Sequence, residues 1–532
     1  MMTMTKGKKE NKMKRALISV SDKRGIVELA KFLQDEGIEI ISTGGTKQAL
    51  KDAGIKVVPV SSFTGAPEIL DGRVKTLHPK IAAGILFRRE VEEDREQLDS
   101  LDYKPIDLVI VNLYPFSQTV ASGKPEADII ENIDIGGPTL IRAAAKNFSS
   151  VAVLVDPNQY EGFVKDYKAT GGALSPELRR SYAGAVFKMI SEYDAAISGY
   201  FAGSAAAKTS NESASEFPSE INLHLKKNAD LRYGENPHQA AAIYQTIGDT
   251  TLSIADAEQL AGKELSYNNY VDLDSVLGMV LDFAEPFACV VKHTNPCGAA
   301  SAATLIEAYR AAHDADPMSA FGSIIGLNRK VDMATAQLLH ETQFVECVLA
   351  PDYDADALAL LEKKKQRRLL RLPAIGKIAP ASRWLRAVHG GFLYQSADRH
   401  TVTEAELSIV TKVKPTAEQI KSLLFGFQLI KHIKSNAIAI LNGTTMVGMG
   451  CGQTSRVDAV ENAVKKAGAR AKGGVLASDA FFPMPDGVEA AVAAGVKSII
   501  QPGGSKKDDE AIAAADKAGI SMVMTGIRHF RH

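Results

Sequence analysis

A lysine and a histidine stand side by side where catalytic groups are expected. Lys292 and His293 follow the apolar run 287–291, which predicts a buried strand. Polar groups at the carboxyl end of a strand commonly form active sites in α/β proteins. Histidine exchanges a proton near neutral pH, and lysine stabilises developing negative charge. The pair indicates acid–base chemistry, and a capped loop with two exposed charges is the alternative from these residues alone.

Both side chains can serve one site only if the backbone turns beside them. Neighbouring side chains of an extended segment point to opposite faces, so we expect the chain to turn after Val291, and Pro296 and Gly298 favour such a turn. His293 and Cys297 together suggest a metal, but no thiolate pair accompanies them. The four cysteines are Cys289, Cys297, Cys347 and Cys451, and no two of them form a CxxC pair. This spacing argues against a zinc site and against disulfides.

Three glycine-rich stretches are candidate phosphate-binding loops. The loop 43–46 (TGGT) follows a predicted strand and opens a helix, so its N–H groups and hydroxyls can face an anion. A loop that only turns the chain is the alternative. The stretch 448–452 has glycines like those of a dinucleotide fingerprint without the third glycine's spacing, which disfavours that interpretation. It leads to Arg456 at a helix start, which suits a phosphate better than a core. The stretch 502–505 (PGGS) repeats the strand-to-helix arrangement.

Two further segments carry ionisable groups at element boundaries. The run 73–80 (RVKTLHPK) holds four groups that can be cationic, and either binds a phosphate and a polar heterocycle or is a solvated face. Asp134 precedes the predicted helix start at 136–138, and Lys146 ends that helix, where its charge is favourable.

The elements that position these groups alternate in type. Strand and helix patterns follow each other from residue 15 to residue 60, with Ser21 or Asp22 as expected cap of the first helix, and further strands are predicted within 107–116 and 151–157. This order predicts a parallel sheet with right-handed crossovers. Ligands bind beyond the carboxyl ends of such strands, where Ser21 and the 43–46 loop fall.

Composition narrows the class of protein. The chain has 532 residues, 62 lysines and arginines against 63 acidic residues, and no apolar run long enough to span a membrane. A nucleic-acid-binding protein would normally carry a basic excess. The basic N-terminus lacks the apolar core of a signal peptide. We therefore expect a cytoplasmic α/β enzyme that binds neither nucleic acid nor membranes.

The chain also shows where its parts divide. Residues 1–14 are expected to be a disordered tail, and the small, polar, unpatterned stretch 202–219 a linker between domains, with a long surface loop as the alternative. The charged run 362–371 is interpreted as a solvated face and not as a nucleic-acid patch. Asn442 and Gly443 predict a hairpin turn.

Taken in order, the motifs resemble one family, the bifunctional purine biosynthesis proteins that combine phosphoribosylaminoimidazolecarboxamide (AICAR) formyltransferase with IMP cyclohydrolase. The resemblance runs from residue 19 to the C-terminus. It is carried by SVSDK, STGGT, GRVKTLHPKI, NLYPF, ENIDIGGPTLIRAAAKN, LRYGENPHQ, KELSYNNYVDLDS, KHTNPCGAA, MSAFG, SNAIAI, GQTSRVDA, SDAFFPMPDG, QPGGS and RHFRH.

The resemblance implies an α/β architecture in two parts. Residues 15–201 would form a cyclohydrolase domain with a methylglyoxal-synthase-like parallel sheet, and residues 220–532 a transformylase region of two cytidine-deaminase-like units without their zinc. It also implies a homodimer with shared transformylase sites. Its ligands would be purine-pathway nucleotides and a reduced folate, with 10-formyltetrahydrofolate as co-substrate and no metal needed for the chemistry.

The resemblance further implies roles for individual residues. Nucleotide binding in the N-terminal domain falls to Ser21, Asp22, Lys23, Thr43, Gly44, Gly45, Thr46, Arg73, Val74, Thr76, Asn112 and Ile135, and chemistry to Lys75, Tyr114, Asp134 and Lys146. In the C-terminal region, nucleotide binding falls to Arg232, Tyr233, Asn269, Gly322, Glu346, Asn436 and Arg456, folate binding to Val457, Phe481, Asp486 and Arg528, and catalysis to Lys292 and His293.

The implied function is formyl transfer to the 5-amino group of the carboxamide ribonucleotide, followed by dehydrative ring closure to IMP. Two rivals remain: a chain with only one active half, and a regulator that binds purine nucleotides without turnover. Retention of Lys146, Lys292 and His293 disfavours both, because a protein that only binds needs the phosphate loops alone.

Overall fold

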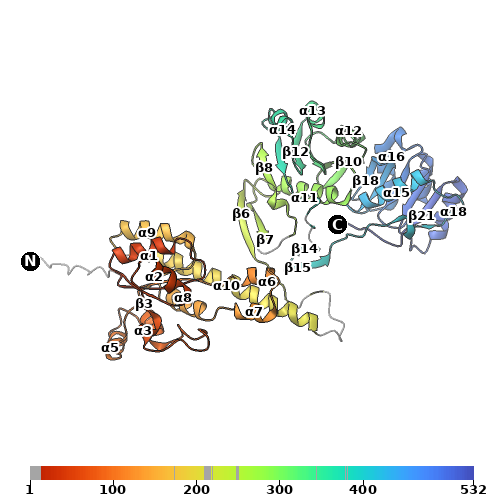
Figure 1. Ribbon diagram of the computed structural model, residues 1–532. Coiled ribbons are helices and arrows are strands. Elements are labelled where there is room, and N and C mark those ends of the chain that lie inside the picture. Colours follow the sequence, from red (N-terminus) through yellow and green to blue (C-terminus); the bar gives the residue numbers. More distant parts are fainter. Residues whose placement is uncertain are drawn as a thin grey trace, which may run out of the picture. The chain divides into compact units, whose positions relative to one another are not determined.

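The chain forms two compact units, Met1–Asn222 and Leu223–His532 (Figure 1). The computed structural model describes residues 13–172, 174–208, 217, 220–246, 251–342, 344–377, 379 and 382–532. Two residues of the expected tail belong to the fold, because Met13 is buried and the Lys14 N–H donates to Asp107 Oδ2 at 2.6 Å, and the rest of the expected tail lies outside the described residues. Helix α10 runs to Lys208, so the first part of the predicted linker is helical, and most of its remainder lies outside the described residues.

A five-stranded sheet organises the N-terminal unit. All its pairings are parallel, in the order β3-β2-β1-β4-β5, which confirms the parallel sheet predicted from the alternating pattern. The strands are β1 (Arg15–Val20), β2 (Glu39–Ser42), β3 (Val58–Pro59), β4 (Leu108–Asn112) and β5 (Ala152–Leu154). The helices are α1 (Ile26–Asp35), α2 (Gly44–Asp52), α3 (Val60–Thr64), α4 (Pro79–Leu86), α5 (Glu92–Ser100), α6 (Phe116–Ala121), α7 (Glu126–Glu131), α8 (Gly136–Lys146), α9 (Tyr160–Ala169) and α10 (Pro176–Lys208), with η1 (Pro157–Gln159).

The first helix begins later than expected. Helix α1 starts at Ile26 after Gly25, which has φ 67° and caps it without a side-chain bond. The N–H groups of Ser21 and Asp22 instead donate to Asn112 Oδ1 at 2.6 and 2.8 Å. The prediction that either residue caps α1 is therefore wrong, because their segment is tied to the end of β4.

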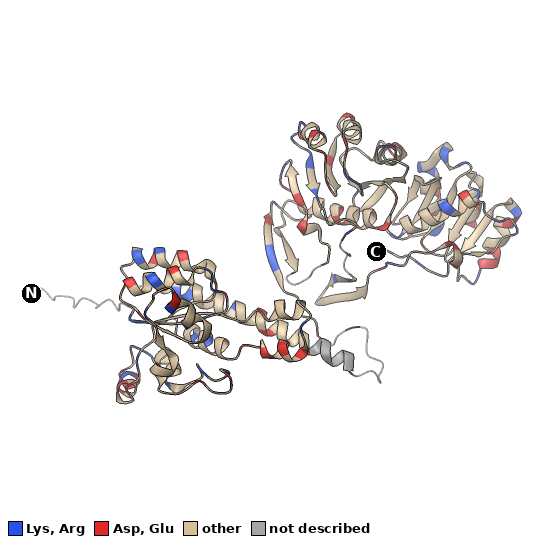
Figure 2. Cartoon of the chain, in the orientation of Figure 1, with Lys and Arg blue, Asp and Glu red and all other residues tan. Residues whose placement is uncertain are grey.

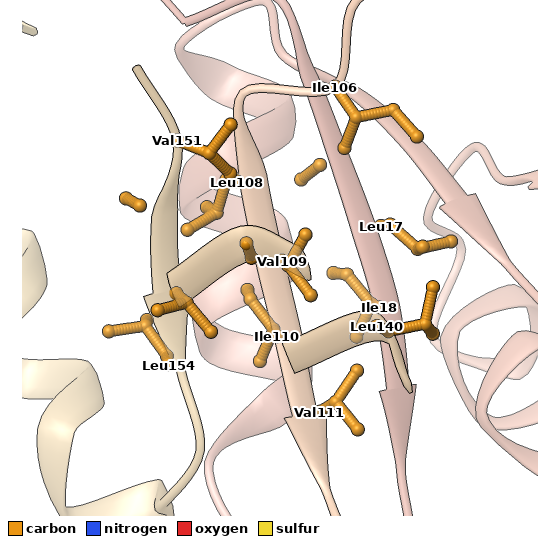
Figure 3. Close-up of a cluster of buried hydrophobic side chains, with 14 of the residues drawn as sticks. Leu17, Ile18, Ile106, Leu108, Val109, Ile110, Val111, Leu140, Val151 and Leu154 are labelled. Atoms are coloured by element: carbon orange, nitrogen blue, oxygen red, sulfur yellow. The ribbon is translucent and has the colours of Figure 1, made fainter. Parts of the chain in front are cut away.

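Aliphatic side chains fix the middle of this sheet. Figure 3 shows Leu17 and Ile18 of β1, Val109 and Ile110 of β4, and Leu140 of α8 in one buried cluster. Burying a side chain of this size stabilises a fold by about 1.5–3 kcal/mol. The core therefore holds β1, β4 and the start of α8 in a fixed relation at the carboxyl edge of the sheet.

The C-terminal unit is built on a twelve-stranded mixed sheet in the order β16-β21-β20-β19-β17-β18-β10-β9-β11-β12-β13-β8. Its strands are β8 (Glu258–Ala261), β9 (Phe287–Lys292), β10 (Asn295–Ser301), β11 (Ser323–Leu327), β12 (Val345–Ala350), β13 (Arg368–Arg371), β16 (Ser408–Ile409), β17 (Ile438–Asn442), β18 (Thr445–Gly450), β19 (Val475–Ser478), β20 (Ser498–Gln501) and β21 (Ser521–Met524). Two separate hairpins pair β6 (Leu225–Leu231) with β7 (Ala241–Thr246), and β14 (Arg383–Val388) with β15 (Gly391–Ser396).

The large sheet has two halves with the same strand pattern. In each half a hairpin, β9–β10 or β17–β18, is followed by three strands that run parallel to one another, and the halves join where Ala300 pairs with Thr445. The helices are α11 (Tyr267–Asp282), α12 (Leu305–Ala315), α13 (Met333–Glu341), α14 (Ala355–Leu361), α15 (Ala417–Ile430), α16 (Arg456–Ala467), α17 (Asp486–Ala493) and α18 (Asp508–Ala518), with η2 (Ile254–Asp256), η3 (Glu404–Glu406) and η4 (Gly468–Ala471).

The glycines of the 448–452 stretch serve packing. A Cβ on Gly448 or Gly450 of β18 would collide with the backbone carbonyl of Ala463 or Ala459 in α16. Both glycines are therefore needed for the close approach of helix and strand, which agrees with rejecting a dinucleotide fingerprint there. The hairpin predicted at Asn442 is confirmed, with Asn442 paired to Thr445.

Only the first part of the charged run 362–371 fits the expected solvated loop or helix face, because Lys363 and Lys365 are exposed while the two arginines that follow them are buried. Arg367 is buried and donates to the Leu339 carbonyl at 2.8 Å, and Arg368 is buried and ion-paired with Glu346 at 3.0 Å. Lys364 Nζ donates to the His340 and Thr342 carbonyls at the end of α13. Elsewhere, basic and acidic residues alternate along both units (Figure 2). Within the described part of the chain, no helix has the length and apolar character needed to cross a membrane.

Candidate active sites

A cavity of about 520 Å³ opens at the carboxyl edge of the N-terminal sheet. It is bounded by the ends of β1, β2 and β4, by the loop before α4 and by the start of α8. The predicted residues that line it are Ser21, Lys23, Thr43, Gly44, Gly45, Thr46, Arg73, Lys75, Thr76, Asn112, Tyr114, Asp134 and Ile135. The geometry of a parallel sheet thus collects motifs that lie more than 100 residues apart.

The floor of this cavity is the start of α2. Its first two residues, Gly44 and Gly45, begin the helix, where free N–H groups favour an anion. A Cβ on Gly44 would lie 3.8 Å from Lys75 Nζ, and one on Gly45 would lie 3.8 Å from Lys23 Nζ. Two ammonium groups therefore stand over the helix start. This arrangement suits a phosphate.

The hydroxyls of the 43–46 loop are already occupied. Thr46 Oγ1 donates to the Val20 carbonyl at 2.9 Å and accepts the Val20 N–H at 3.0 Å, which ties α2 to β1. Thr43 Oγ1 donates to Glu68 Oε1 at 2.5 Å. The expectation that these hydroxyls face an anion is not met, and the backbone and the two lysines remain as its partners.

Asp134 is fixed at the start of α8. Its Oδ1 accepts the Gly137 N–H at 2.7 Å, and its own N–H donates to Tyr193 Oη at 2.8 Å. Burial raises the pKa of Asp134, against the lowering effect of the Gly137 and Tyr114 N–H groups and of Lys75. Sequence reasoning missed Tyr193, because one tyrosine in a long helix carries no signal that it reaches a loop about 60 positions earlier.

Replacing Asp134 by asparagine should stabilise the N-terminal unit more at pH 7 than at pH 4. At pH 4, close to the ordinary carboxyl pKa of 3.8, little of the ionisation difference between folded and unfolded chains has developed, so the carboxyl contributes little. Above its folded-state pKa the buried charge opposes folding, so removing it raises the free energy of unfolding. Asparagine keeps an acceptor for the Gly137 N–H. Urea unfolding of parent and variant at both pH values measures the difference, and an equal difference at both would contradict the prediction.

Three predicted residues do not join this cavity. Asp22 is half-buried and pairs with Arg24, which lowers the pKa of its carboxyl, and Val74 contributes only backbone bonds to Ile69. Lys146 is exposed at the far end of α8 from Asp134, about 15 Å along the helix axis. Lys146 therefore does not line the cavity of its own chain, and the role implied by the resemblance stays a prediction.

In the C-terminal unit, Lys292 and His293 lie at the tip of the β9–β10 hairpin. Lys292 pairs with Asn295, so His293 and Thr294 are the two turn residues, with φ values of 51° and 65°. Two successive left-handed residues form a type I′ turn. The predicted turn after Val291 is confirmed, and Pro296 lies just beyond it in β10 as the partner of Val291.

The Lys292 side chain reaches a second predicted residue. Its Nζ donates to the Phe321 carbonyl at 2.8 Å, beside Gly322, whose φ of 71° favours glycine. On the neighbouring helix, Asn269 Nδ2 donates to Glu346 Oε1 at 3.3 Å, and its Oδ1 caps the Ser266 N–H. The structure thus places Lys292 beside Gly322 and joins Asn269 to Glu346, four residues that were predicted separately.

Asn436 and Arg456 form a second linked group beside the hairpin. Arg456 is buried. Its Nη2 donates a hydrogen bond to Asn436 Oδ1 at 2.8 Å, and its Nη1 forms an ion pair with Asp479. The Lys434 N–H donates to Asn295 Oδ1 at 3.1 Å, which ties this segment to the His293 turn. Arg456 is tied to Asn436 and Asp479, and its contact with a phosphate stays a prediction. Sequence reasoning missed Asp479, which lies 23 residues from its partner.

The remaining predicted residues are largely exposed. Arg232 stacks on Tyr233 at 4.8 Å, and Arg528 on Phe530 at 4.3 Å. Phe481 is 37% exposed, Val457 is half-buried and Asp486 opens α17. The His529 N–H donates to the Asp479 carbonyl, which holds the C-terminus near the segment that leads to Phe481. Aromatic surfaces and a free cation suit a flat heterocycle with a carboxylate. Among the described residues, no group of three or more histidines, cysteines or acidic residues is arranged to hold a metal ion.

Comparison with known proteins adds to this geometry. Residues 144–466 match a family model described as "AICARFT/IMPCHase bienzyme", and residues 25–139 match an MGS-like domain. The chain is 49% identical over 522 residues, 98% of this chain and 100% of the relative, to "Bifunctional purine biosynthesis protein PurH" of Bacillus mycoides and equally to that of Halalkalibacterium halodurans. A solved structure titled "Crystal structure of ForH" is 37% identical, covering 36% of this chain and 98% of its own, with a TM-score of 0.32.

Proposed function

The chain belongs to the AICARFT/IMPCHase bienzyme family and is a bifunctional enzyme of purine biosynthesis, and from this we propose which residues perform each half-reaction. Formyl transfer takes place in the unit Leu223–His532, around the Lys292–His293 turn. Ring closure takes place in the cavity of the unit Met1–Asn222, around Lys75 and Asp134. The observation that carries this assignment is that each unit gathers its own set of ionisable groups at strand ends.

In formyl transfer, the 5-amino nitrogen of the ribonucleotide attacks the formyl carbon. That nitrogen is conjugated to the imidazole carboxamide, so it attacks weakly unless it loses its proton. His293 takes the proton as general base. Lys292 stabilises the transient oxyanion and supplies a proton to the departing nitrogen of the formyl donor. The products are the formylated ribonucleotide and the deformylated donor.

We propose 10-formyltetrahydrofolate as the formyl donor. Phe481 and Phe530 offer exposed aromatic faces, and Arg528 offers a cation for a carboxylate. Val457 and Asp486 complete this side of the site. Asn269, Glu346, Asn436 and the Arg232–Tyr233 pair bind the nucleotide.

In ring closure, the carboxamide nitrogen attacks the formyl carbon and water is lost. An amide nitrogen is a poor nucleophile, so holding the two groups in contact supplies much of the acceleration. The phosphate lies over the start of α2 between Lys23 and Lys75. Lys75 stabilises the oxyanion, while Asp134 and Tyr114 relay protons from the attacking nitrogen to the leaving oxygen.

The experiment for the whole assignment measures IMP formation by ultraviolet absorbance. The purified chain receives the amino ribonucleotide with 10-formyltetrahydrofolate, or the formylated ribonucleotide alone. IMP from both mixtures supports two working sites. IMP from the second mixture only, or binding without turnover, contradicts it.

We further propose that the chain works as a homodimer whose transformylase sites draw on both subunits. The β14–β15 hairpin exposes Trp384, Phe392 and Leu393, a grouping typical of an interface. Mixing Lys292→Ala chains with Arg528→Ala chains should restore transformylase. If the two residues come from opposite subunits, one site of each mixed dimer has both intact. No restoration, with the chains still dimeric by sedimentation, contradicts sharing for this pair.

A further inference from the structure

The turn that carries His293 has an unfavourable backbone. Both His293 and Thr294 are in the left-handed region, which side chains with a Cβ rarely adopt and which β-branched residues disfavour most. Type I′ turns normally contain asparagine and glycine for this reason. The sequence of the turn therefore does not explain its conformation, and a contact from outside must hold it.

Asp272 makes that contact. It lies on α11, one turn after Asn269, and its Oδ1 accepts the Thr294 N–H at 2.6 Å. Burial raises the pKa of Asp272, and the N–H groups of Thr294 and His293 act against that rise. A carboxylate that accepts from backbone N–H groups forms stronger bonds than a neutral acceptor. Helix α11 packs on β9 itself, so the carboxylate is fixed relative to the strand that enters the turn.

The other side of the turn is closed by its own residues. Thr294 Oγ1 and Asn295 Nδ2 both donate to the His293 carbonyl, at 2.7 and 3.0 Å. These bonds orient the carbonyl but leave the N–H groups of the turn to Asp272. The two sets together fix the backbone on both sides of His293.

We propose that Asp272 is a positioning residue for formyl transfer, which holds the left-handed His293–Thr294 turn so that the imidazole and the Lys292 ammonium face the same substrate. This inference rests on the proposed role of His293. Without Asp272 the turn would relax toward ordinary backbone conformations and move the imidazole away from the amino nitrogen. A displacement of about 1 Å in a catalytic group can cost about 100-fold in rate.

The test compares Asp272→Ala, Asp272→Asn, Thr294→Gly and the double variant Asp272→Ala with Thr294→Gly. Glycine adopts the left-handed conformation without steric cost, so it should make the turn independent of the carboxylate. We expect Asp272→Ala to lower transformylase kcat about 10- to 100-fold with little change in KM for the nucleotide. Asp272→Asn, which keeps an oxygen acceptor, should lose less. Thr294→Gly alone should stay near the parental rate, and the double variant should regain most of the loss.

Asp332→Ala is the matched control. Asp332 caps α13 by accepting the Thr335 N–H at 2.8 Å, so its loss removes the same kind of bond in the same unit, away from the turn. Transformylase kcat should be unchanged there, and cyclohydrolase should be unchanged in every variant. If Asp272→Ala does not fold, Asp272→Asn with and without Thr294→Gly carries the comparison.

Two results would overturn the inference: a parental kcat in the Asp272 variants, or a loss that Thr294→Gly does not repair. A failure of the proposed role of His293 gives a different result. In that case His293→Ala itself would transfer the formyl group at the parental rate. If the Asp272 variants kept the parental transformylase kcat while His293→Ala was inactive, His293 would keep its role as general base. Only the positioning by Asp272 would then be rejected.

Discussion

His293→Ala should lose about 10²–10⁴-fold of transformylase turnover, the range typical when a positioned general base is removed. The nucleophile must shed a proton as it attacks, and with the imidazole gone only water remains to accept it. Nucleotide binding should be largely kept, because the proposed nucleotide contacts come from other elements, such as Asn269 of α11 and Asn436 before β17. The loss should therefore appear in kcat and hardly in KM.

The two half-reactions must be measured separately on this variant. Ring closure of added formylated ribonucleotide should proceed at the parental rate, because its residues lie in the other compact unit. His400→Ala is a matched control, since His400 is an exposed histidine of the same unit that bonds to Glu406 at 2.9 Å. Near-parental formyl transfer in His293→Ala would reduce the histidine to a turn residue and leave Lys292 without its partner.

The position of His293 shows how far sequence reasoning reached. The apolar run before Lys292 predicted the strand, and β9 ends at Lys292 as expected. The turn type was missed, because His-Thr lacks the asparagine and glycine that mark a type I′ turn. The conformation depends on Asp272, about 20 positions earlier, and no local pattern reveals that contact.

The N-terminal cavity was more predictable. Its motifs follow strands of a parallel sheet, and the topology alone brings Ser21, Thr43 and Asn112 to one edge. The sequence did not predict the role of each side chain in the cavity. The Thr43 and Thr46 hydroxyls serve internal bonds, and only coordinates distinguish a hydroxyl that holds a loop from one that is free.

Buried charges were the main source of error. Arg456 and Arg367 were expected at the surface or on a ligand, because arginine is rarely buried without a partner. Asp479 provides the partner for Arg456, and a backbone carbonyl does so for Arg367. Such partners are set by tertiary packing, so a helix-start position or a charged run cannot identify them.

Lys75→Ala should abolish most ring closure, with a loss of about 10²–10³-fold, the cost of removing one donor to a developing oxyanion. Lys75 lines the cavity, stands over Gly44 and acts electrostatically on Asp134. Formyl transfer should continue, so the formylated ribonucleotide should accumulate when the amino ribonucleotide and formyl donor are supplied. Lys75→Arg should recover part of the rate, because it keeps the charge but changes the donor geometry.

Two other lysines make this experiment specific. Lys80 lies outside the cavity with its Nζ 5.7 Å from the Tyr103 ring, so Lys80→Ala should close the ring at the parental rate. Lys146 is exposed at the far end of α8, and Lys146→Ala should also be parental if one chain forms the whole site. A large loss in Lys146→Ala would mean that this lysine enters the cavity of a second subunit. Parental ring closure in Lys75→Ala would instead show that the oxyanion is stabilised elsewhere, and the proposed N-terminal site would be wrong.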